Sequence, residues 1–303
     1  MKSGRILITG AGGFVGRALA LGFAERGWEV YALDRSFDGP PGHPRVRHVL
    51  ADLLDGVWSD LPQVDVVVHG AWLTTDPRTL GLTDAEYERT NLAPLTTVLS
   101  YATHRPPQSL VFVSSSGVFA PDDAEDGLTD AHAPTGSSPY AASKRRGEML
   151  TSTWGSEGLS RTHVIRLGYL FGPDEVVRPS RDGVSLVARW MDAARNGQPV
   201  EVRDDDPARD WTYTPDLASA LERLVAEPPA RRPIHFGSPH VAHDRELAAR
   251  IIDEIGSGEL VTVPAGTRVK PPMVPSDIPA LRDVAWTTPG DGVQALVEAE
   301  AAA

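Results

Sequence analysis

The 303-residue chain contains no cysteine. This absence excludes disulfides, thiolate zinc sites and a cysteine nucleophile, and it is consistent with a cytoplasmic protein. Lysine is nearly absent as well, since only Lys2, Lys144 and Lys270 occur among 29 basic residues. A lysine that stands at a motif position is therefore informative.

Positive charge is in deficit, with a formal net charge of −12. Nucleic acids and anionic membranes select clustered positive charge, so neither is expected as a partner. No apolar run approaches the roughly 20 residues that a membrane helix needs. The run Arg5-Ile6-Leu7-Ile8 is a short strand-like segment and not a signal sequence. We expect a cytoplasmic protein that acts on a small molecule.

Short apolar or β-branched runs alternate with helix-length segments through the first half of the chain. The predicted strands are Ile6–Thr9, Glu29–Leu33, Val46–Leu50, Val64–Val68, Leu110–Val113 and Thr162–Arg166. The predicted helices between them include Phe14–Arg26, Asp84–His104 and Pro139–Trp154. This alternation predicts an α/β fold, a doubly wound parallel sheet with helices on both faces.

A glycine-rich loop joins the first predicted strand to the first predicted helix. Gly10, Gly13 and Gly16 leave room for a pyrophosphate to approach the backbone. Phe14 and Val15 open the helix, whose N-terminus offers free N–H groups and the positive end of the helix dipole. The position of the triplet directly after a strand predicts a dinucleotide site.

Asp34 ends the second predicted strand, 18 residues after Gly16. A carboxylate there accepts both ribose hydroxyls and repels a 2′-phosphate, which favours NAD over NADP. A solvated turn aspartate is the alternative, and Arg35 next to it softens the preference by offering a phosphate contact. Residues 1–167 are thus predicted to form an NAD-binding Rossmann domain.

The pattern becomes less regular after Arg166, where several prolines interrupt it. Residues 168–303 are predicted to form a smaller, mixed C-terminal lobe that binds substrate. Helical patterns recur at Val184–Asn196, Pro215–Ala226 and Arg245–Ile255. Ile234–Gly237 is predicted to be a strand, and about 210–237 is expected to rejoin the main sheet.

Tyr140 and Lys144 stand four residues apart, on one face of a helix that Ser138-Pro139 starts. A phenol is a poor base near pH 7, but a nearby ammonium and an oxidised nicotinamide are expected to lower its pKa. Ser115, at the end of the strand Val111–Val113, is expected to bind the substrate oxygen. An unrelated surface pair of tyrosine and lysine is the alternative.

These motifs together resemble the extended short-chain dehydrogenase/reductases, the NAD-dependent epimerase/dehydratase family. The resemblance covers nearly the whole chain and runs through the glycine loop, Asp34, Asp52-Leu53, His69-Gly70-Ala71, Asn91, the serine strand end, Tyr140–Lys144, Arg166–Pro173, Arg209-Asp210-Trp211 and Asp277–Pro289. It implies the catalytic set Ser115, Tyr140 and Lys144, with Ser114 and Ser116 as second choices for the hydroxyl.

The resemblance also implies roles in cofactor binding. Asp52 and Leu53 would flank the adenine, and Lys144 would bind the nicotinamide ribose. Asn91 would brace the nicotinamide side. Along the pyrophosphate and ribose, the expected residues are Gly70, Ala71 and Trp72.

Departures from the family pattern bear on the reaction. Ser116-Gly117 follow Ser115 where the family's 4,6-dehydratases resemble one another in an Asp-Glu pair, so dehydration is not expected. Tyr169 stands where many nucleotide-sugar enzymes of the family have asparagine, which argues for a smaller substrate.

Arg209 lies in a motif whose arginine often meets an anionic substrate group. Pairing with Asp204, Asp205 or Asp206 on the surface is equally open. The residues expected to shape the substrate pocket are Thr74, Ser115, Ser116, Tyr169 and Arg209. No metal site is predicted, because His240 and His243 lie in a turn-like stretch without a clear third ligand.

The leading hypothesis is an NAD-dependent oxidoreductase that transfers a hydride between nicotinamide and a secondary alcohol or ketone of a sugar-like or natural-product substrate. A nucleotide-sugar epimerase with tightly bound NAD is the alternative, and a non-catalytic NAD-sensing protein is a third. The resemblance implies a homodimer formed through Asp84–His104 and Pro139–Trp154.

Overall fold

The computed structural model describes residues 4–39, 42–230 and 232–301. Its larger sheet has seven strands, and every pairing between them is parallel. In spatial order they are β10 (Ile234–His235), β6 (Arg161–Leu167), β5 (Ser109–Ser115), β4 (Val66–His69), β1 (Arg5–Thr9), β2 (Glu29–Asp34) and β3 (Val46–Leu50). The doubly wound parallel sheet predicted from the sequence is confirmed, and Ile234 joins its edge beside Ile165.

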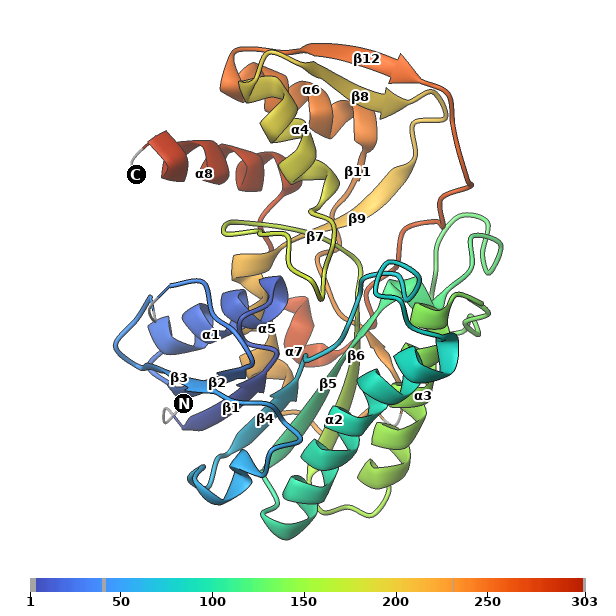
Figure 1. Ribbon diagram of the computed structural model, residues 1–303. Coiled ribbons are helices and arrows are strands. Elements are labelled where there is room, and N and C mark those ends of the chain that lie inside the picture. The colour runs from blue at the N-terminus through green and yellow to red at the C-terminus, as the bar shows by residue number, and fades with distance from the viewer. Residues whose placement is uncertain (1–3, 40–41, 231, 302–303) are drawn as a thin grey trace.

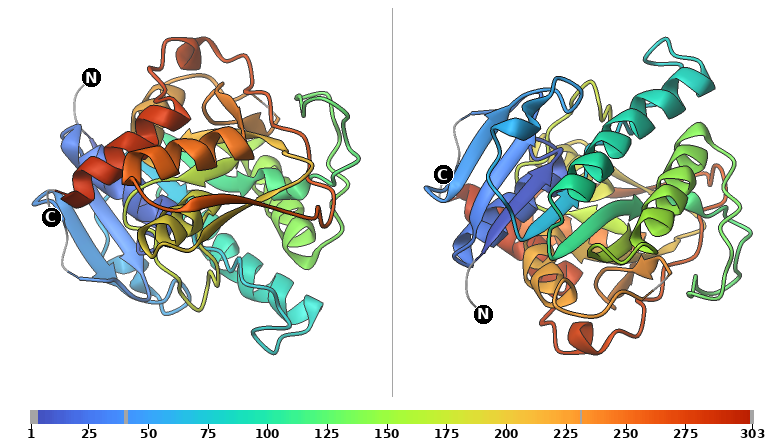
Figure 2. Two further views of the ribbon diagram at one scale, coloured as in Figure 1. Left: turned by 90° about the horizontal axis from the view of Figure 1, so that it is seen from above. Right: turned by 90° about the horizontal axis from the view of Figure 1, so that it is seen from below.

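Helices cover both faces of this sheet (Figures 1 and 2). One face carries α1 (Phe14–Glu25), α5 (Leu217–Leu224) and the short α7 (Pro279–Arg282), and the other carries α2 (Asp84–His104) and α3 (Pro139–Gly155). Side chains alternate along each strand, so Ile6 and Ile8 of β1 pack in one hydrophobic cluster while Leu7 packs in the other.

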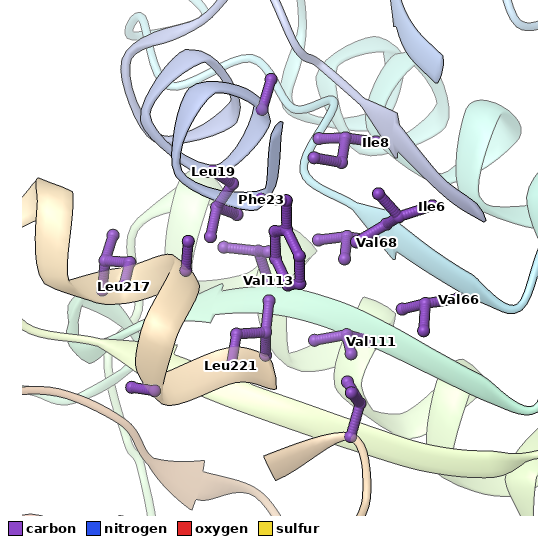
Figure 3. Close-up of a cluster of buried hydrophobic side chains, with 14 of the residues drawn as sticks. Ile6, Ile8, Leu19, Phe23, Val66, Val68, Val111, Val113, Leu217 and Leu221 are labelled. Atoms are coloured by element: carbon purple, nitrogen blue, oxygen red, sulfur yellow. The ribbon is translucent and has the colours of Figure 1, made fainter. Parts of the chain in front are cut away.

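Phe23 of α1 lies at the centre of the first cluster, between the sheet and α5 (Figure 3). Ile6, Val68 and Val113 approach it from three neighbouring strands, and Leu221 approaches it from α5. Phe23 is fully buried, so this layer fixes α1 against the strand ends that precede the glycine loop.

A smaller lobe lies above the C-terminal ends of the parallel strands (Figure 1). Its mixed sheet has the order β11 (Val241–His243), β9 (Ala208–Tyr213) and β7 (Tyr169–Phe171), and β8 (Pro199–Arg203) pairs in parallel with β12 (Glu259–Val263). The helices α4 (Leu186–Arg195), α6 (Asp244–Ile255) and α8 (Pro289–Ala301) complete its own hydrophobic cluster.

Two stretches of the C-terminal half pack back onto the larger sheet. Residues 217–236 contribute α5 and β10 to its first hydrophobic cluster. Leu281 and Val284 pack there as well, although the sequence placed them in the lobe. Three short 3₁₀ helices complete the described elements: η1 (Val57–Ser59), η2 (Ser116–Val118) and η3 (Thr214–Asp216). Within the described residues, no helix has the length and apolar character needed to span a bilayer.

Candidate active site

The glycine loop is packed so closely that side chains are excluded. Gly10 has a φ of +72°, and a Cβ there would lie 2.6 Å from the backbone nitrogen of Ala71. A Cβ on Gly16 would lie 2.1 Å from the carbonyl oxygen of Gly10. Gly13 caps α1 with its backbone, and Phe14 and Val15 form the first turn. The loop therefore presents bare backbone and a helix N-terminus to a ligand.

A cavity of about 650 Å³ opens beside this loop. It runs along the C-terminal ends of the parallel strands, where ligands bind in open α/β sheets. Thirteen of the predicted cofactor residues line it: Gly10, Gly13, Phe14, Val15, Gly16, Asp34, Arg35, Asp52, Leu53, Gly70, Ala71, Trp72 and Asn91. Of the predicted substrate residues, Thr74, Ser115 and Tyr169 also line it.

Asp34 is held rigidly at the end of β2. Its carboxylate accepts hydrogen bonds from the backbone N–H of Gly12 at 2.9 Å and of Arg35 at 2.7 Å. The guanidinium of Arg35 lies 3.7 Å from the Asp52 carboxylate, and the Arg35 side chain is largely exposed. Asp34 thus faces the cavity in a fixed orientation, while Arg35 is drawn towards Asp52.

Ser115 is the serine that the strand end delivers to the cavity. It lies at the C-terminus of β5, and its Oγ accepts the backbone N–H of Gly117 at 3.0 Å. Ser114 is buried and donates to Glu148 at 2.6 Å. Ser116 is 3% exposed and is not among the described residues that line the cavity, so its part in the substrate pocket stays a prediction.

Helix α3 begins where the sequence predicts it. The Ser138 hydroxyl accepts the backbone N–H of Ala141 at 3.1 Å, and Pro139 occupies the first helical position. Tyr140 thereby lies in the first turn. Its ring packs against Gly117, where a Cβ would lie 2.9 Å from Cε1 of Tyr140 and 3.2 Å from Oγ of Ser115, so the two side chains border the same glycine.

Lys144 lies one helical turn beyond Tyr140, in an aromatic environment. Its Nζ donates to the carbonyl oxygen of Val113 at 2.7 Å and lies 4.3 Å from the centre of the Trp72 ring. The ring of Phe112 is 5.1 Å away. Burial lowers the pKa of Lys144 to about 7, against an opposing effect of the Glu148 carboxylate.

The protein groups around Tyr140 together do not lower its pKa, in contrast to the prediction. Burial raises the pKa of Tyr140, and both the hydrogen bond with Ser115 and the charge of Arg181 oppose that rise. The expected effect of Lys144 is wrong for a physical reason: its ammonium is directed to Val113 and Trp72 and is itself partly neutralised by burial. Ser115 and Trp72, which neighbour Tyr140 and Lys144, are among the residues that line the cavity, whereas Tyr140 and Lys144 themselves are not.

Comparison with known protein families complements this geometry. The family model described as the NAD dependent epimerase/dehydratase family matches residues 6–237. The chain belongs to this family.

Individual relatives of this family member differ in their reactions. The chain is 29% identical over 227 residues to 2-alkyl-3-oxoalkanoate reductase of Stenotrophomonas maltophilia, a match that covers 71% of this chain and 63% of that protein. It therefore spans less than two thirds of that relative. It is 26% identical over 296 residues to dTDP-4-dehydro-6-deoxy-D-allose reductase of Streptomyces bikiniensis, covering 92% of this chain and 90% of that protein.

Solved structures share the fold at lower identity. The UDP-N-acetylglucosamine 4-epimerase of Methanobrevibacter ruminantium M1, in complex with UDP-N-acetylmuramic acid, superposes with a TM-score of 0.82 at 19% identity, covering 100% of this chain and 99% of that one. MoeE5 in complex with UDP-glucuronic acid and NAD gives a TM-score of 0.79 at 23% identity, covering 99% of each chain.

NAD is the cofactor of the family, and the cavity has groups that suit it. Asn91 is 1% exposed, and its Oδ1 accepts the backbone N–H of Leu73 at 2.7 Å. Its Nδ2 has no hydrogen-bond partner among the described residues. A buried amide donor at the cavity wall suits an oxygen-bearing ligand. The bare backbone of the glycine loop suits a pyrophosphate.

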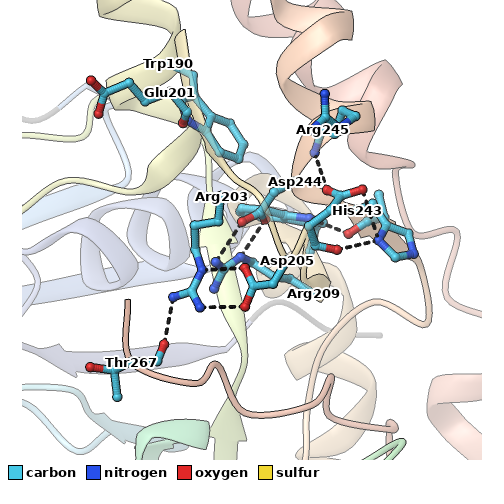
Figure 4. A network of polar contacts seen from close by, with 12 residues as sticks. Trp190, Glu201, Arg203, Asp205, Arg209, His243, Asp244, Arg245 and Thr267 are labelled. Atoms are coloured by element: carbon cyan, nitrogen blue, oxygen red, sulfur yellow. Dashed lines mark hydrogen bonds and ion pairs between the residues drawn. The ribbon is translucent and has the colours of Figure 1, made fainter. Parts of the chain in front are cut away.

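Arg209 is committed to a partner that the sequence did not indicate. Its Nε and Nη2 donate to the two Asp244 carboxylate oxygens at 2.6 and 2.8 Å, and both side chains are buried (Figure 4). Asp205 instead pairs with Arg203. Arg209 is not among the described residues that line the cavity, and its contact with a substrate anion stays a prediction.

Tyr169 lies between two cations. The guanidinium carbon of Arg209 is 4.5 Å from the centre of its ring, and the Nζ of Lys270 is 4.3 Å away. Lys270 reaches this point from a segment 101 residues later, so no local sequence pattern indicates the contact. Tyr169 thus brings a ring, where many relatives have asparagine, to the wall between the cavity and these cations.

Sequence reasoning also missed a segment that crosses the cavity. Residues 173–185, here called the strap, connect β7 to α4 and appear in yellow-green in Figure 1. Ser180 accepts the backbone N–H of Thr74 at 2.8 Å, and the Arg178 guanidinium donates to Ser36. The strap residues that line the cavity are Val176, Arg178, Ser180, Arg181 and Ser185.

His240 and His243 each lie within hydrogen-bond distance of a backbone carbonyl oxygen. His240 Nε2 lies 3.2 Å from the carbonyl oxygen of Trp286, and His243 Nδ1 lies 2.7 Å from that of Asp206. Over the ranges that the structure describes, no group of three or more histidine and carboxylate side chains is arranged to hold a metal ion.

Proposed function

We propose that the chain transfers a hydride reversibly between the nicotinamide of NAD and a secondary alcohol or ketone of a sugar-like or natural-product substrate. One observation carries this proposal. The Ser115 and Tyr140 side chains border the same glycine, Gly117, at the C-terminal end of β5, with Lys144 one helical turn beyond Tyr140. The pair lies beside the cavity that the glycine loop lines.

Tyr140, Ser115 and Lys144 have separate roles in the proposed reaction. Bound NAD supplies the hydride acceptor, or the donor in the reverse direction. As the alcohol is oxidised, Tyr140 takes the hydroxyl proton, and in reduction it returns that proton to the oxygen. Ser115 donates a hydrogen bond to the same oxygen and holds it beside Tyr140. Lys144, one helical turn beyond Tyr140 on α3, would hold the nicotinamide ribose when NAD is bound.

A ketone substrate fits the names of the relatives. One is a reductase of 2-alkyl-3-oxoalkanoates and another a reductase of a 4-dehydro sugar nucleotide. In both names the group reduced is a ketone. Tyr169 lines the cavity and contacts Arg209, and Arg209 itself is paired with Asp244, which favours the smaller class of substrate.

Dehydration is not proposed, although one relative, from Streptomyces niveus, is named dTDP-glucose 4,6-dehydratase. Elimination of water needs an acid and a base in addition to the hydride relay. Here Ser116 is buried and Gly117 offers only its backbone. No carboxylate pair follows Ser115.

A nucleotide-sugar epimerase is the second candidate, favoured by the strap across the cavity. An epimerase must retain its reduced cofactor while the substrate turns over, and the Ser180 and Arg178 contacts hold the strap beside the cavity that these residues line. The neighbours named as epimerases share the fold. This candidate uses the same Ser115, Tyr140 and Lys144.

The absorbance of NADH at 340 nm separates the candidates. The purified chain is mixed with NADH and either a 2-alkyl-3-oxoalkanoate or a dTDP-4-keto-6-deoxy sugar. A reductase consumes NADH in stoichiometric amounts, whereas an epimerase interconverts UDP-sugars with no net change. NADPH serves as the matched control, because Asp34 is expected to repel its 2′-phosphate. If no ketone consumes NADH and a UDP-sugar is interconverted, the epimerase replaces the reductase.

We also propose a homodimer formed through α2 and α3. These helices pack side by side on one face of the sheet, and Met149 of α3 is 51% exposed. Light scattering after size exclusion measures the mass: twice 32.5 kDa supports the dimer and a single chain mass rejects it.

A further inference from the structure

The strap carries a charged side chain that the mechanism above does not use. Arg181 lies at the end of a tight turn in which Arg178 and Arg181 exchange two backbone hydrogen bonds of 2.8 Å. Ser180, inside that turn, also accepts the Thr74 hydroxyl at 3.1 Å. Hydrogen bonds within the turn and from Thr74 therefore fix its conformation, and with it the backbone position of Arg181.

The Arg181 guanidinium is directed towards the ligand region. Its central carbon lies 4.7 Å from the centre of the Phe14 ring, and Phe14 is the first residue of α1. Its charge also lowers the pKa of Tyr140. Arg181 therefore lies between the helix N-terminus and the catalytic phenol, and it lines the cavity. A dinucleotide that extends from the glycine loop to Tyr140 must pass it.

One end of this guanidinium lacks a partner. Nη2 is paired with Glu175, a buried carboxylate that also accepts the Ser185 backbone N–H at 2.7 Å. Nη1 is buried and has no hydrogen-bond partner among the described residues. A buried guanidinium N–H without an acceptor costs free energy, which an anionic oxygen placed there would recover.

We propose that Arg181 binds the pyrophosphate of NAD, from the side of the cavity opposite the glycine loop. The helix N-terminus supplies roughly half a positive charge, which does not balance the charges of a pyrophosphate. A guanidinium adds a fork of N–H donors that matches phosphate oxygens, and Nη1 stays available for them while Nη2 is paired with Glu175. The strap thus completes the cofactor site, and Arg181 is a cofactor-binding residue that the glycine loop motif does not include.

The test is the affinity for NAD, measured by titration calorimetry without any turnover. Arg181→Gln is expected to weaken binding of NAD and of ADP-ribose about ten- to a hundredfold, and to leave binding of adenosine within twofold. Arg189→Gln, on the exposed side of α4, removes the same charge and is expected to bind NAD as the native chain does. Arg181→Lys keeps the charge without the fork and is expected to be intermediate.

Glu175→Gln separates ligand binding from a structural ion pair. A glutamine still accepts from Ser185, and it leaves the charge of Arg181 available to the ligand, so NAD affinity should be retained or improved. If Glu175→Gln loses as much affinity as Arg181→Gln, the role of Arg181 is to hold the strap and the proposal is overturned.

Two further outcomes overturn it. One is NAD affinity of both Arg181→Gln and Arg181→Lys equal to that of Arg189→Gln. The other is unchanged NAD affinity with weakened binding of UDP, which would assign the anion to the substrate side. The inference does not depend on the ketone proposal: a chain that binds NAD through Arg181 but reduces no ketone would refute only the proposed reaction.

Discussion

The ammonium of Lys144 lies 4.3 Å from the centre of the Trp72 ring. The indole nitrogen of Trp72 in turn donates to the Ser143 hydroxyl at 3.3 Å, so the ring is fixed to the same helix as Lys144. A Cβ on Gly147 would lie 2.6 Å from the Phe112 ring and 3.0 Å from the Trp72 ring, which explains why the helix has a glycine there. Trp72, which lines the cavity, thus covers the Lys144 ammonium and keeps it poorly solvated.

Lys144 should therefore titrate far below an ordinary lysine. Burial lowers its pKa to about 7, and ¹³C-labelled lysine gives only three side-chain signals in this chain. One of them is expected to titrate near pH 7 and to vanish in Lys144→Met. Because the unfolded chain keeps the proton up to pH 10.5, this group makes the folded state more stable as pH rises from about 7 to that value. Three signals that all titrate near 10.5 would contradict this environment for Lys144.

Ser114 and Ser115 should separate stability from catalysis. Ser114→Ala removes the bond to buried Glu148 and is expected to lower the free energy of unfolding by about 1–3 kcal/mol. Turnover at a temperature where the variant is folded should be nearly native. Ser115→Ala should do the reverse, with near-native urea unfolding and a kcat reduced about a hundredfold or more. Equal losses of kcat in both variants would remove the distinction between the two serines.

Gly16→Ala should damage the cofactor site through sterics alone. The new Cβ would lie 2.1 Å from the Gly10 carbonyl, so the backbone must shift. We expect a loss of about 1–3 kcal/mol in the free energy of unfolding and a large loss of NAD affinity. Gly290→Ala is the matched control, because nothing lies within 4 Å of a Cβ there. A Gly16→Ala chain that binds NAD normally would show that the loop is not the pyrophosphate site.

Arg209 should contribute to stability more than to binding. Arg209→Met leaves the Asp244 carboxylate buried without its partner, at an expected cost of about 3–5 kcal/mol in urea unfolding. The double variant Arg209→Met, Asp244→Leu removes both charges and should recover most of that loss. A single variant with native stability and a raised KM would instead restore the predicted contact with a substrate anion.

The sequence predicted those parts of the molecule that local patterns encode. Strand and helix periodicity placed the elements of the parallel sheet, and α2 has the exact bounds expected, because Thr83 and Glu86 form a capping box at its start. The glycine loop, Asp34 and Ser115 were assigned to strand ends, where the fold brings them to one cavity. The location of such residues can be predicted because it follows from the strand or helix to which they belong.

Contacts between side chains far apart in the sequence could not be predicted. Asp244 reaches Arg209 over 35 residues, and three nearer aspartates offered equally plausible partners. The strap has no hydrophobic period, so nothing in it indicates that Arg181 faces Phe14. The prediction of a low pKa for Tyr140 failed for a related reason. The four-residue spacing placed Lys144 on the correct face of the helix. Burial and the hydrogen bond to the Val113 carbonyl decide where the Lys144 charge acts, and the spacing reveals neither.

Tyr140→Phe tests the central claim most directly. The substitution removes one hydroxyl and keeps the ring that packs against Gly117. NADH consumption at 340 nm with a ketone that the native chain reduces should fall at least a thousandfold, while the Kd for NAD stays within a few-fold of native. Native turnover in this variant would show that the proton does not pass through Tyr140, and the proposed reaction would have to be abandoned.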